Sequence, residues 1–150
     1  MQAAAITDYK SHFVNGHFNY CGEAGIGICA TIMPFIDLES NLPASKFTDE
    51  FLKKLCSTTA SVLGKPEDRM NLSVKSGLAM LMAGSTAPCV ILCISAIGVT
   101  DTAEKNKEHS AKIFNFLTGE LGLSEDRIVI RFYPLEPWQV GKKGTVMSFL

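Results

Sequence analysis

The sequence predicts an α/β fold in which two βαβ repeats form a four-stranded mixed sheet with two helices on one face. Three observations lead to this prediction. A strand pattern, a helical stripe and a second strand pattern follow one another twice; each helix ends at a glycine; and each glycine is followed by a turn that contains Glu-Asp-Arg. In a strand–helix–strand unit the two strands are parallel and the helix crosses over one face of the sheet.

The first copy begins at Pro34, where apolar and polar residues alternate as in a half-buried strand. A helical stripe runs to Leu63 and stops at Gly64, a residue type typical of helix C-termini. A second alternating strand is predicted over residues 70–76. The apolar stripe of the helix comprises Phe47, Phe51, Leu52, Leu55, Cys56, Thr59, Val62 and Leu63.

The second copy begins with a nearly continuous apolar strand over residues 88–99. Asp101 stands three residues before Glu104, which predicts a capping box with Asp101 as the N-cap. The helix that follows is expected to end at Gly122, and a strand is predicted over 128–132. The second copy thus follows the same plan as the first.

The strand over 88–99 carries apolar side chains in both directions, at Val90, Ile91, Leu92, Cys93, Ile94, Ala96 and Ile97. Two helices cover only one face of a sheet, so the other apolar face needs a partner, and burial alone favours an oligomer. The tail over 143–150 is expected to add a strand that could pair across the interface.

Composition excludes several classes of protein. The 150 residues are 47% hydrophobic and 19% charged, which fits one globular domain, and the net charge of −1 gives no basic field for nucleic acid or an acidic membrane. No apolar run reaches the roughly 18 residues that span a membrane, and no secretory signal is recognisable. Five irregularly spaced cysteines favour reduced thiols and a cytoplasmic location over a disulfide framework.

Residues 1–33 differ from the rest and are expected to form a poorly ordered extension, with residues 34–150 as the domain proper. The extension shows no sustained period of either 3.6 or 2 residues. It contains two histidines and two cysteines, but their spacing matches no zinc pattern, so no metal site is expected. These residues are His12, His17, Cys21 and Cys29.

The region 34–150 resembles the tautomerase superfamily, which includes macrophage migration inhibitory factor, and within it the D-dopachrome decarboxylase branch. The resemblance covers essentially all of 34–150 without a gap, and residues 1–33 lie outside it. The runs that carry it are Asn41-Leu42-Pro43-Ala44, Gly64-Lys65-Pro66-Glu67-Asp68-Arg69, Gly77-Leu78-Ala79-Met80, Asp126-Arg127-Ile128-Val129-Ile130-Arg131-Phe132, Pro134-Leu135-Glu136, Trp138-Gln139 and Gly144-Thr145-Val146-Met147.

The resemblance implies a homotrimer with an active site at each subunit boundary, and no cofactor. It implies that Pro34 is the catalytic base, acting through a free N-terminal amine. Lys65 matches the family's substrate-binding lysine, Ile97 the residue whose backbone N–H binds substrate, and Arg69 and Lys142 further basic residues near the pocket. The plainer alternatives are a proline that starts an edge strand, a surface lysine and a core isoleucine.

The activity implied by the resemblance is conversion of D-dopachrome to 5,6-dihydroxyindole and CO2. The alternatives are a leaderless secreted, cytokine-like protein that binds the invariant-chain receptor, and a catalytically silent subunit. Pro34 follows Met33 in this sequence, so its nitrogen is free only if the working chain starts at Pro34. An alternative start and a genuine longer form both remain open. Ala96 stands where the family leads us to expect serine, whereas Val129 and Arg131 agree with the D-dopachrome branch and predict weak use of phenylpyruvate-type substrates.

Overall fold

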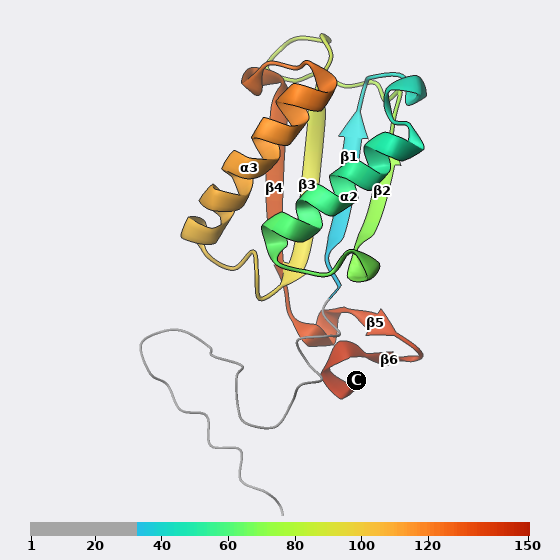
Figure 1. Ribbon diagram of the computed structural model, residues 1–150, viewed down its shortest axis with the longest axis vertical. Helices are drawn as coiled ribbons and strands as arrows, with labels where there is room; N and C mark the ends of the chain where they lie inside the picture. The colour runs from blue at the N-terminus through green and yellow to red at the C-terminus, as the bar shows by residue number, and fades with distance from the viewer. Residues whose placement is uncertain (1–32) are drawn as a thin grey trace, which may run out of the picture.

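The structure, a computed structural model, describes residues 33–150 of the chain as two layers, a four-stranded sheet and two helices that cover one of its faces (Figure 1). The strands of this sheet are β1 (Phe35–Ser40), β2 (Asn71–Lys75), β3 (Val90–Ile97) and β4 (Ile128–Leu135). Their order is β2-β1-β3-β4; β1 is parallel to β2, β3 is parallel to β4, and β1 and β3 are antiparallel neighbours. The predicted double βαβ fold with a mixed sheet is confirmed.

The core lies between the sheet and the helices. Alternate side chains of the two central strands face the helices and are fully buried, at Ile36 and Leu38 on β1 and at Val90, Leu92 and Ile94 on β3. They pack with the apolar stripes of α2 (Asp49–Leu63) and α3 (Ala103–Leu121). Burial of these side chains, at about 1.5–3 kcal/mol each, is the main force that holds the two layers together.

Each helix begins at a threonine and ends at a glycine. Thr48 accepts a hydrogen bond from the N–H of Phe51 at the start of α2. Gly64 and Gly122 follow the two helices with φ of +63° and +65°, a left-handed conformation that favours glycine. Both predicted helix ends are confirmed.

The predicted cap of the second helix is wrong by one residue. Thr102, not Asp101, is the N-cap of α3, and its side chain accepts from the N–H of Lys105. The Asp101 carboxylate instead lies 2.8 Å from the Lys105 ammonium. An aspartate that already pairs with a cation leaves the hydroxyl of the next residue to cap the helix.

The tail differs from the single strand predicted over 143–150. It forms a hairpin of β5 (Gly141–Lys142) and β6 (Thr145–Val146), followed by a 3-10 turn over Met147–Phe149. Lys143 and Gly144 at the hairpin turn both have positive φ, as a two-residue turn with the twist of the strands requires. The hairpin lies beyond the end of the sheet where β1 begins and β4 finishes (Figure 1).

The second face of the sheet is not covered by any described element, as predicted, but it is more polar than the sequence suggested. Ile91 and Cys93 on β3 and the exposed Val129 and Tyr133 on β4 give it apolar area. On its other half, Asp37 accepts from Ser73, and Glu39 lies 3.2 Å from Lys75. The face therefore combines a charged half on β1 and β2 with a half on β3 and β4 that is apolar except for Arg131.

Candidate active site at the start of β1

Pro34 immediately precedes β1 and is fully buried. The backbone N–H of Asn71 at the start of β2 donates to the Pro34 carbonyl at 3.0 Å, and the side-chain nitrogen of Asn71 lies 3.4 Å from the same oxygen. The proline is thus held in a fixed place in the apolar end of the sheet. Its nitrogen is bonded to the carbonyl carbon of Met33 in this chain.

Ile97 is brought to the same end of the sheet from the last position of β3. The antiparallel register pairs Phe35 with Ser95, so the start of β1 and the end of β3 lie side by side. Ile97 is 7% exposed and packs with Val140 and Met147 in a small apolar cluster to which Phe35 also belongs. Its side chain is therefore a core residue, which leaves only its backbone for contact with a substrate.

Lys142 reaches this site from the C-terminal hairpin. Its ammonium nitrogen lies 2.8 Å from the sulfur of Met33, the residue bonded to the Pro34 nitrogen. This contact places a positive charge within one residue of the candidate base. The hairpin turn at Lys143-Gly144 fixes β5 and so directs this lysine toward the start of β1.

Arg69 approaches from the turn before β2. It ends the 3-10 turn Glu67–Arg69, and its carbonyl lies 3.5 Å from the same Asn71 side chain that contacts the Pro34 carbonyl. Within residues 33–150, its guanidinium has one weak partner, the exposed carboxylate of Asp68 at 3.9 Å. The charge of Arg69 is therefore available to bind an anionic group near Pro34.

Lys65 lies just after α2, where the N–H groups of Gly64 and Lys65 donate to Ser61 and Ala60 and close the helix. Its side chain is half-buried. Among the described residues, no hydrogen bond or ion pair joins this side chain to another protein group. The structure therefore places Lys65 on the α2–β2 connection without showing a direct contact with the other candidates.

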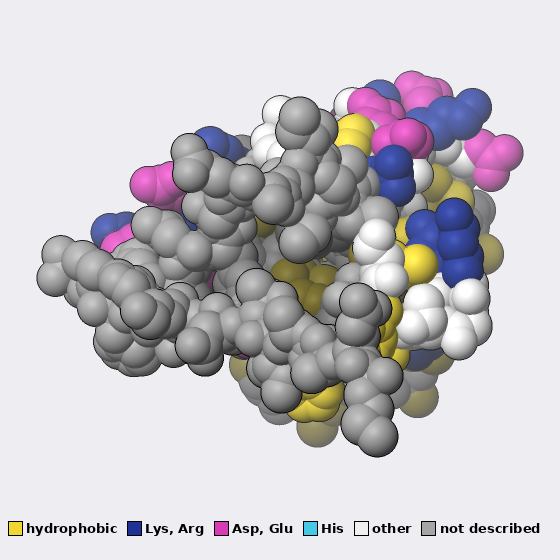
Figure 2. Space-filling model, turned by 90° about the horizontal axis from the view of Figure 1, so that it is seen from below, with side chains coloured by type: hydrophobic (Ala, Val, Ile, Leu, Met, Phe, Trp, Pro, Cys, Tyr) yellow, Lys and Arg dark blue, Asp and Glu magenta, His cyan; other side chains and the backbone are white. Residues whose placement is uncertain are grey.

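Figure 2 views this end of the molecule and shows basic side chains gathered beside hydrophobic ones, with a group of acidic side chains next to them. Hydrophobic surface with a few cations suits a small aromatic acid, because the ring is desolvated while its carboxylate pairs with a cation. Two shallow, open hollows of about 470 and 490 Å³ lie on the surface away from Pro34, one along α3 and one over residues 78–86.

Sequence reasoning missed Asn71, which links Pro34 to Arg69. The only signal was an amide residue at the first position of the predicted second strand. Ala96 is fully buried on the helix-facing side of β3, so an apolar side chain suits its place. On the open face, the guanidinium of Arg131 lies 5.1 Å from the ring centre of Tyr133, and Val129 is 42% exposed.

Among residues 33–150, no cluster of three or more His, Cys, Asp or Glu side chains could hold a metal ion, and the four candidates at 12–29 lie outside the described residues. Cys56, Cys89 and Cys93 are free thiols. Burial, with a smaller contribution from Glu67, raises the pKa of the Cys56 thiol, which makes it a poor nucleophile.

No helix in the described part is long and apolar enough to cross a bilayer.

The profile of macrophage migration inhibitory factor matches residues 33–148. The chain belongs to the macrophage migration inhibitory factor family. The structure of the family member from Prochlorococcus marinus superposes with a TM-score of 0.69 at 28% identity, covering 75% of this chain and 98% of that one. The corresponding structure from Trichinella spiralis has a TM-score of 0.69 at 26% identity, with the same coverage.

Within this family, the similarity is high to proteins named D-dopachrome decarboxylase. The D-dopachrome decarboxylase-B of Xenopus laevis is 58% identical over 118 residues, which are 79% of this chain and the whole of the relative. The D-dopachrome decarboxylase of Mus musculus is 57% identical over the same length and coverage. The aligned length of 118 residues is as long as the described region that begins at Met33.

Proposed function

We propose that the chain, when its N-terminus is Pro34, converts D-dopachrome to 5,6-dihydroxyindole and CO2. The observation that carries this proposal is the 57–58% identity to proteins named D-dopachrome decarboxylase over their whole length. The geometry supports it, because a buried proline, a half-buried arginine and a lysine from the C-terminal hairpin lie at the same end of the sheet, near the start of β1.

Pro34 is the proposed base. A free α-amine has a pKa of about 7.7–8.0, far below that of lysine, and burial in apolar surroundings lowers it further by disfavouring the charged form. The bond between the ring and the ionised carboxylate breaks and CO2 leaves, while the electron pair stays in the ring system. One proton is taken up from solvent, and one proton moves within the molecule that remains. The Pro34 nitrogen would accept this proton and return it, and a base near the working pH does this most effectively.

The basic residues are proposed to hold the substrate's charged oxygens. Lys65 would bind the carboxylate, Arg69 and Lys142 would bind further oxygens near Pro34, and the backbone N–H of Ile97 would donate to the substrate. Support for Arg69 comes from its weakly paired guanidinium and from its carbonyl next to the Asn71 side chain, and for Lys142 from its approach to Met33. Charge-assisted hydrogen bonds of this kind are about twice as strong as neutral ones. No cofactor takes part in this scheme.

The test is turnover of D-dopachrome by the chain that starts at Pro34, with Pro34→Gly as the comparison. The variant keeps an amine but loses the ring that fixes its direction and its secondary character. We expect loss of CO2 and formation of 5,6-dihydroxyindole by the parent, and a large fall for the variant. A parent chain of confirmed mass that leaves D-dopachrome unchanged would refute the proposed activity.

We further propose a homotrimer in which a neighbouring subunit completes each site. The open sheet face with Val129 and Tyr133, and the exposed Trp138, Phe149 and Leu150 near the candidate site, leave apolar surface that a partner would bury. Sedimentation at micromolar concentration tests this, and a stable, folded monomer would contradict it.

A second candidate function is cytokine-like binding to the invariant-chain receptor after leaderless secretion from the cytoplasm. Membership of the macrophage migration inhibitory factor family favours it. The two functions are separable, because Pro34→Gly removes catalysis without changing the outer surface. Receptor binding that persists in this variant, while dopachrome turnover vanishes, would show that signalling is independent of the enzyme. The absence of binding by either form would exclude this second function.

A further inference from the structure

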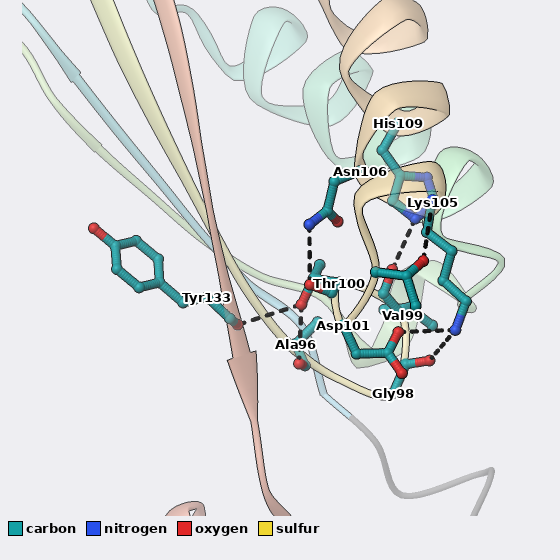
Figure 3. A network of polar contacts seen from close by, with 10 residues as sticks. Ala96, Gly98, Val99, Thr100, Asp101, Lys105, Asn106, His109 and Tyr133 are labelled. Carbon is teal, nitrogen blue, oxygen red and sulfur yellow. Dashed lines mark hydrogen bonds and ion pairs between the residues drawn. The ribbon is translucent and has the colours of Figure 1, made fainter. Parts of the chain in front are cut away.

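The loop that follows β3 is held by α3 through its backbone carbonyls, one after another. The Lys105 ammonium donates to the carbonyl of Gly98 at 3.2 Å, and the Nε2 of His109 donates to that of Val99 at 2.9 Å. The side-chain nitrogen of Asn106 donates to the carbonyl of Thr100 at 3.1 Å. Three successive carbonyls thus bind side chains from the first two turns of one helix, as Figure 3 shows.

Thr100 ties the same loop to the sheet. Its side chain is 2% exposed, and its hydroxyl lies 3.2 Å from the carbonyl of Ala96 and 3.3 Å from that of Tyr133. Those two oxygens belong to the neighbouring strands β3 and β4. One hydroxyl proton is therefore shared between the ends of two strands, while the Thr100 carbonyl is held by α3 (Figure 3).

These contacts lie on both sides of Ile97. Ala96 precedes it, and Gly98, which follows it, has a φ of +72° and turns the chain toward the loop. Lys105 is exposed, so its bond is weak, but Thr100 is buried and Asn106 is half-buried, where a hydrogen bond is protected from water. Thr100, Asn106 and the half-buried His109 thus make the better-protected hydrogen bonds of the loop.

We infer that Thr100 and Asn106 are positioning residues that fix the direction of the Ile97 backbone N–H toward a substrate at Pro34. The inference rests on the proposed function, in which that N–H binds the substrate. A loop held only by its ends would let the peptide between Ala96 and Gly98 rotate, whereas the Thr100 hydroxyl and the α3 side chains fix it before substrate arrives. Preorganised donors of this kind are effective because they need no rearrangement on binding.

The test uses the chain that starts at Pro34 and three threonine variants. Thr100→Val keeps the shape of the side chain and removes the hydroxyl, and Thr100→Ser restores the hydroxyl. The control is Thr59→Val, since Thr59 is also fully buried and donates to a carbonyl, that of Leu55 at 2.7 Å, but lies within α2. Asn106→Leu is a second probe, because its buried Oδ1 has no hydrogen-bond partner among the described residues and only the Nδ2 bond is lost.

For Thr100→Val and Asn106→Leu we expect KM for D-dopachrome to rise about tenfold, with kcat within about twofold of the parent. Thr100→Ser should stay within about twofold of the parent in both constants. Thr59→Val should lower the melting temperature as much as Thr100→Val does, yet leave KM unchanged. Amide hydrogen exchange at Gly98 and Val99, measured without substrate, should quicken in Thr100→Val and stay unchanged in Thr59→Val.

The outcomes separate the two claims. An inactive parent chain overturns the proposed function and this inference with it. An active parent with the same KM in Thr100→Val and Thr59→Val overturns the positioning role alone. If Thr100→Val fails to fold, an unchanged KM in a folded Asn106→Leu has the same consequence.

Discussion

The two βαβ repeats contain the same Glu-Asp-Arg turn but use its arginine differently. In the first repeat, the N–H of Arg69 donates to Pro66 at 3.1 Å; in the second, the N–H of Arg127 donates to Ser124 at 3.0 Å, so the backbone of the turn is the same. The two arginine side chains, however, have different partners. Among the described residues, the Arg69 guanidinium has only the exposed Asp68 at 3.9 Å as a partner, whereas the Arg127 guanidinium donates to four carbonyls of the preceding loop, those of Met82, Ser85, Ala87 and Pro88.

The strand register explains what this difference means. Asn71, two residues after Arg69, pairs with Phe35, and Val129, two residues after Arg127, pairs with Ile91. Val90 therefore holds in the second repeat the place that Pro34 holds in the first, and both are fully buried. The four carbonyls bound by Arg127 all belong to residues that precede this place.

The corresponding position in the first repeat lies just ahead of Pro34. In a chain that starts at Pro34, no residue precedes it, so the space that backbone carbonyls fill beside Arg127 is open beside Arg69. Substrate oxygens would then take the part that those carbonyls play in the second repeat. The repeated motif thus stabilises a loop in one copy and is proposed to bind a ligand in the other.

The largest expected effect comes from the chain ahead of Pro34. With Met33 in place, the Pro34 nitrogen belongs to an amide whose lone pair is delocalised into the carbonyl, so it cannot accept a proton. We expect the full 150-residue chain to turn over D-dopachrome at least about a hundredfold more slowly than the chain that starts at Pro34. Intact mass, measured before and after the assay, must confirm both termini. Equal rates with the extension intact would show that Pro34 is not the base.

The second prediction compares the two arginines directly. Arg127→Ala leaves four carbonyls without their partner and should lower the free energy of unfolding by about 3 kcal/mol. Arg69→Ala removes one exposed ion pair and should change it by less than about 0.5 kcal/mol, while raising KM for D-dopachrome. Urea unfolding at one protein concentration, together with steady-state kinetics, checks both halves. A stability loss of equal size in the two variants would contradict the division of roles.

The sequence predicted those parts of the fold that depend on neighbouring residues along the chain. Periodicity and the two helix-ending glycines correctly predicted both βαβ units, because apolar spacing and positive φ act locally. The cap at Thr102 and the hairpin at 141–146 were missed, since each depends on which neighbour a side chain or strand finds in space. The different partners of the Arg69 and Arg127 side chains could not be predicted either, because both repeats contain the same Glu-Asp-Arg motif.

The site was predicted through resemblance rather than through local pattern. The structure brings Pro34, Arg69, Ile97 and Lys142 to one end of the sheet, which no spacing along the chain reveals. The roles of Asn71 and Thr100 were not predicted, because their side chains contact carbonyls of other strands. The expectation that residues 1–33 form a poorly ordered extension falls almost wholly outside the described residues and stays a prediction.

A third, smaller effect is expected at Lys65, on the helix end that both repeats share. Lys65→Ala removes a charge proposed to bind the substrate carboxylate, a bond of about 1.5–3 kcal/mol, so KM should rise tenfold or more with kcat little changed. Lys53→Ala, at an exposed position of α2, is the matched control and should leave both constants as they are. An unchanged KM with a collapsed kcat would place Lys65 in the chemical step instead of in binding.

The smallest expected effect is at the N-caps of the two helices, where the two repeats should behave alike. Thr48 and Thr102 cap α2 and α3 through the same bond, each hydroxyl accepting a backbone N–H at 3.3 Å. Thr48→Ala and Thr102→Ala should therefore each lower the free energy of unfolding by about 1 kcal/mol, or roughly 2–4 °C in Tm. Both must be measured at one protein concentration, because assembly stabilises the folded state by mass action. If the two threonine variants lose the same free energy of unfolding while the two arginine variants lose different amounts, the repeats differ in their side-chain partners and not in their backbone. A much larger loss for Thr102→Ala would instead show that the loop after Ile97 depends on the start of α3, and the two repeats would then differ in the backbone as well.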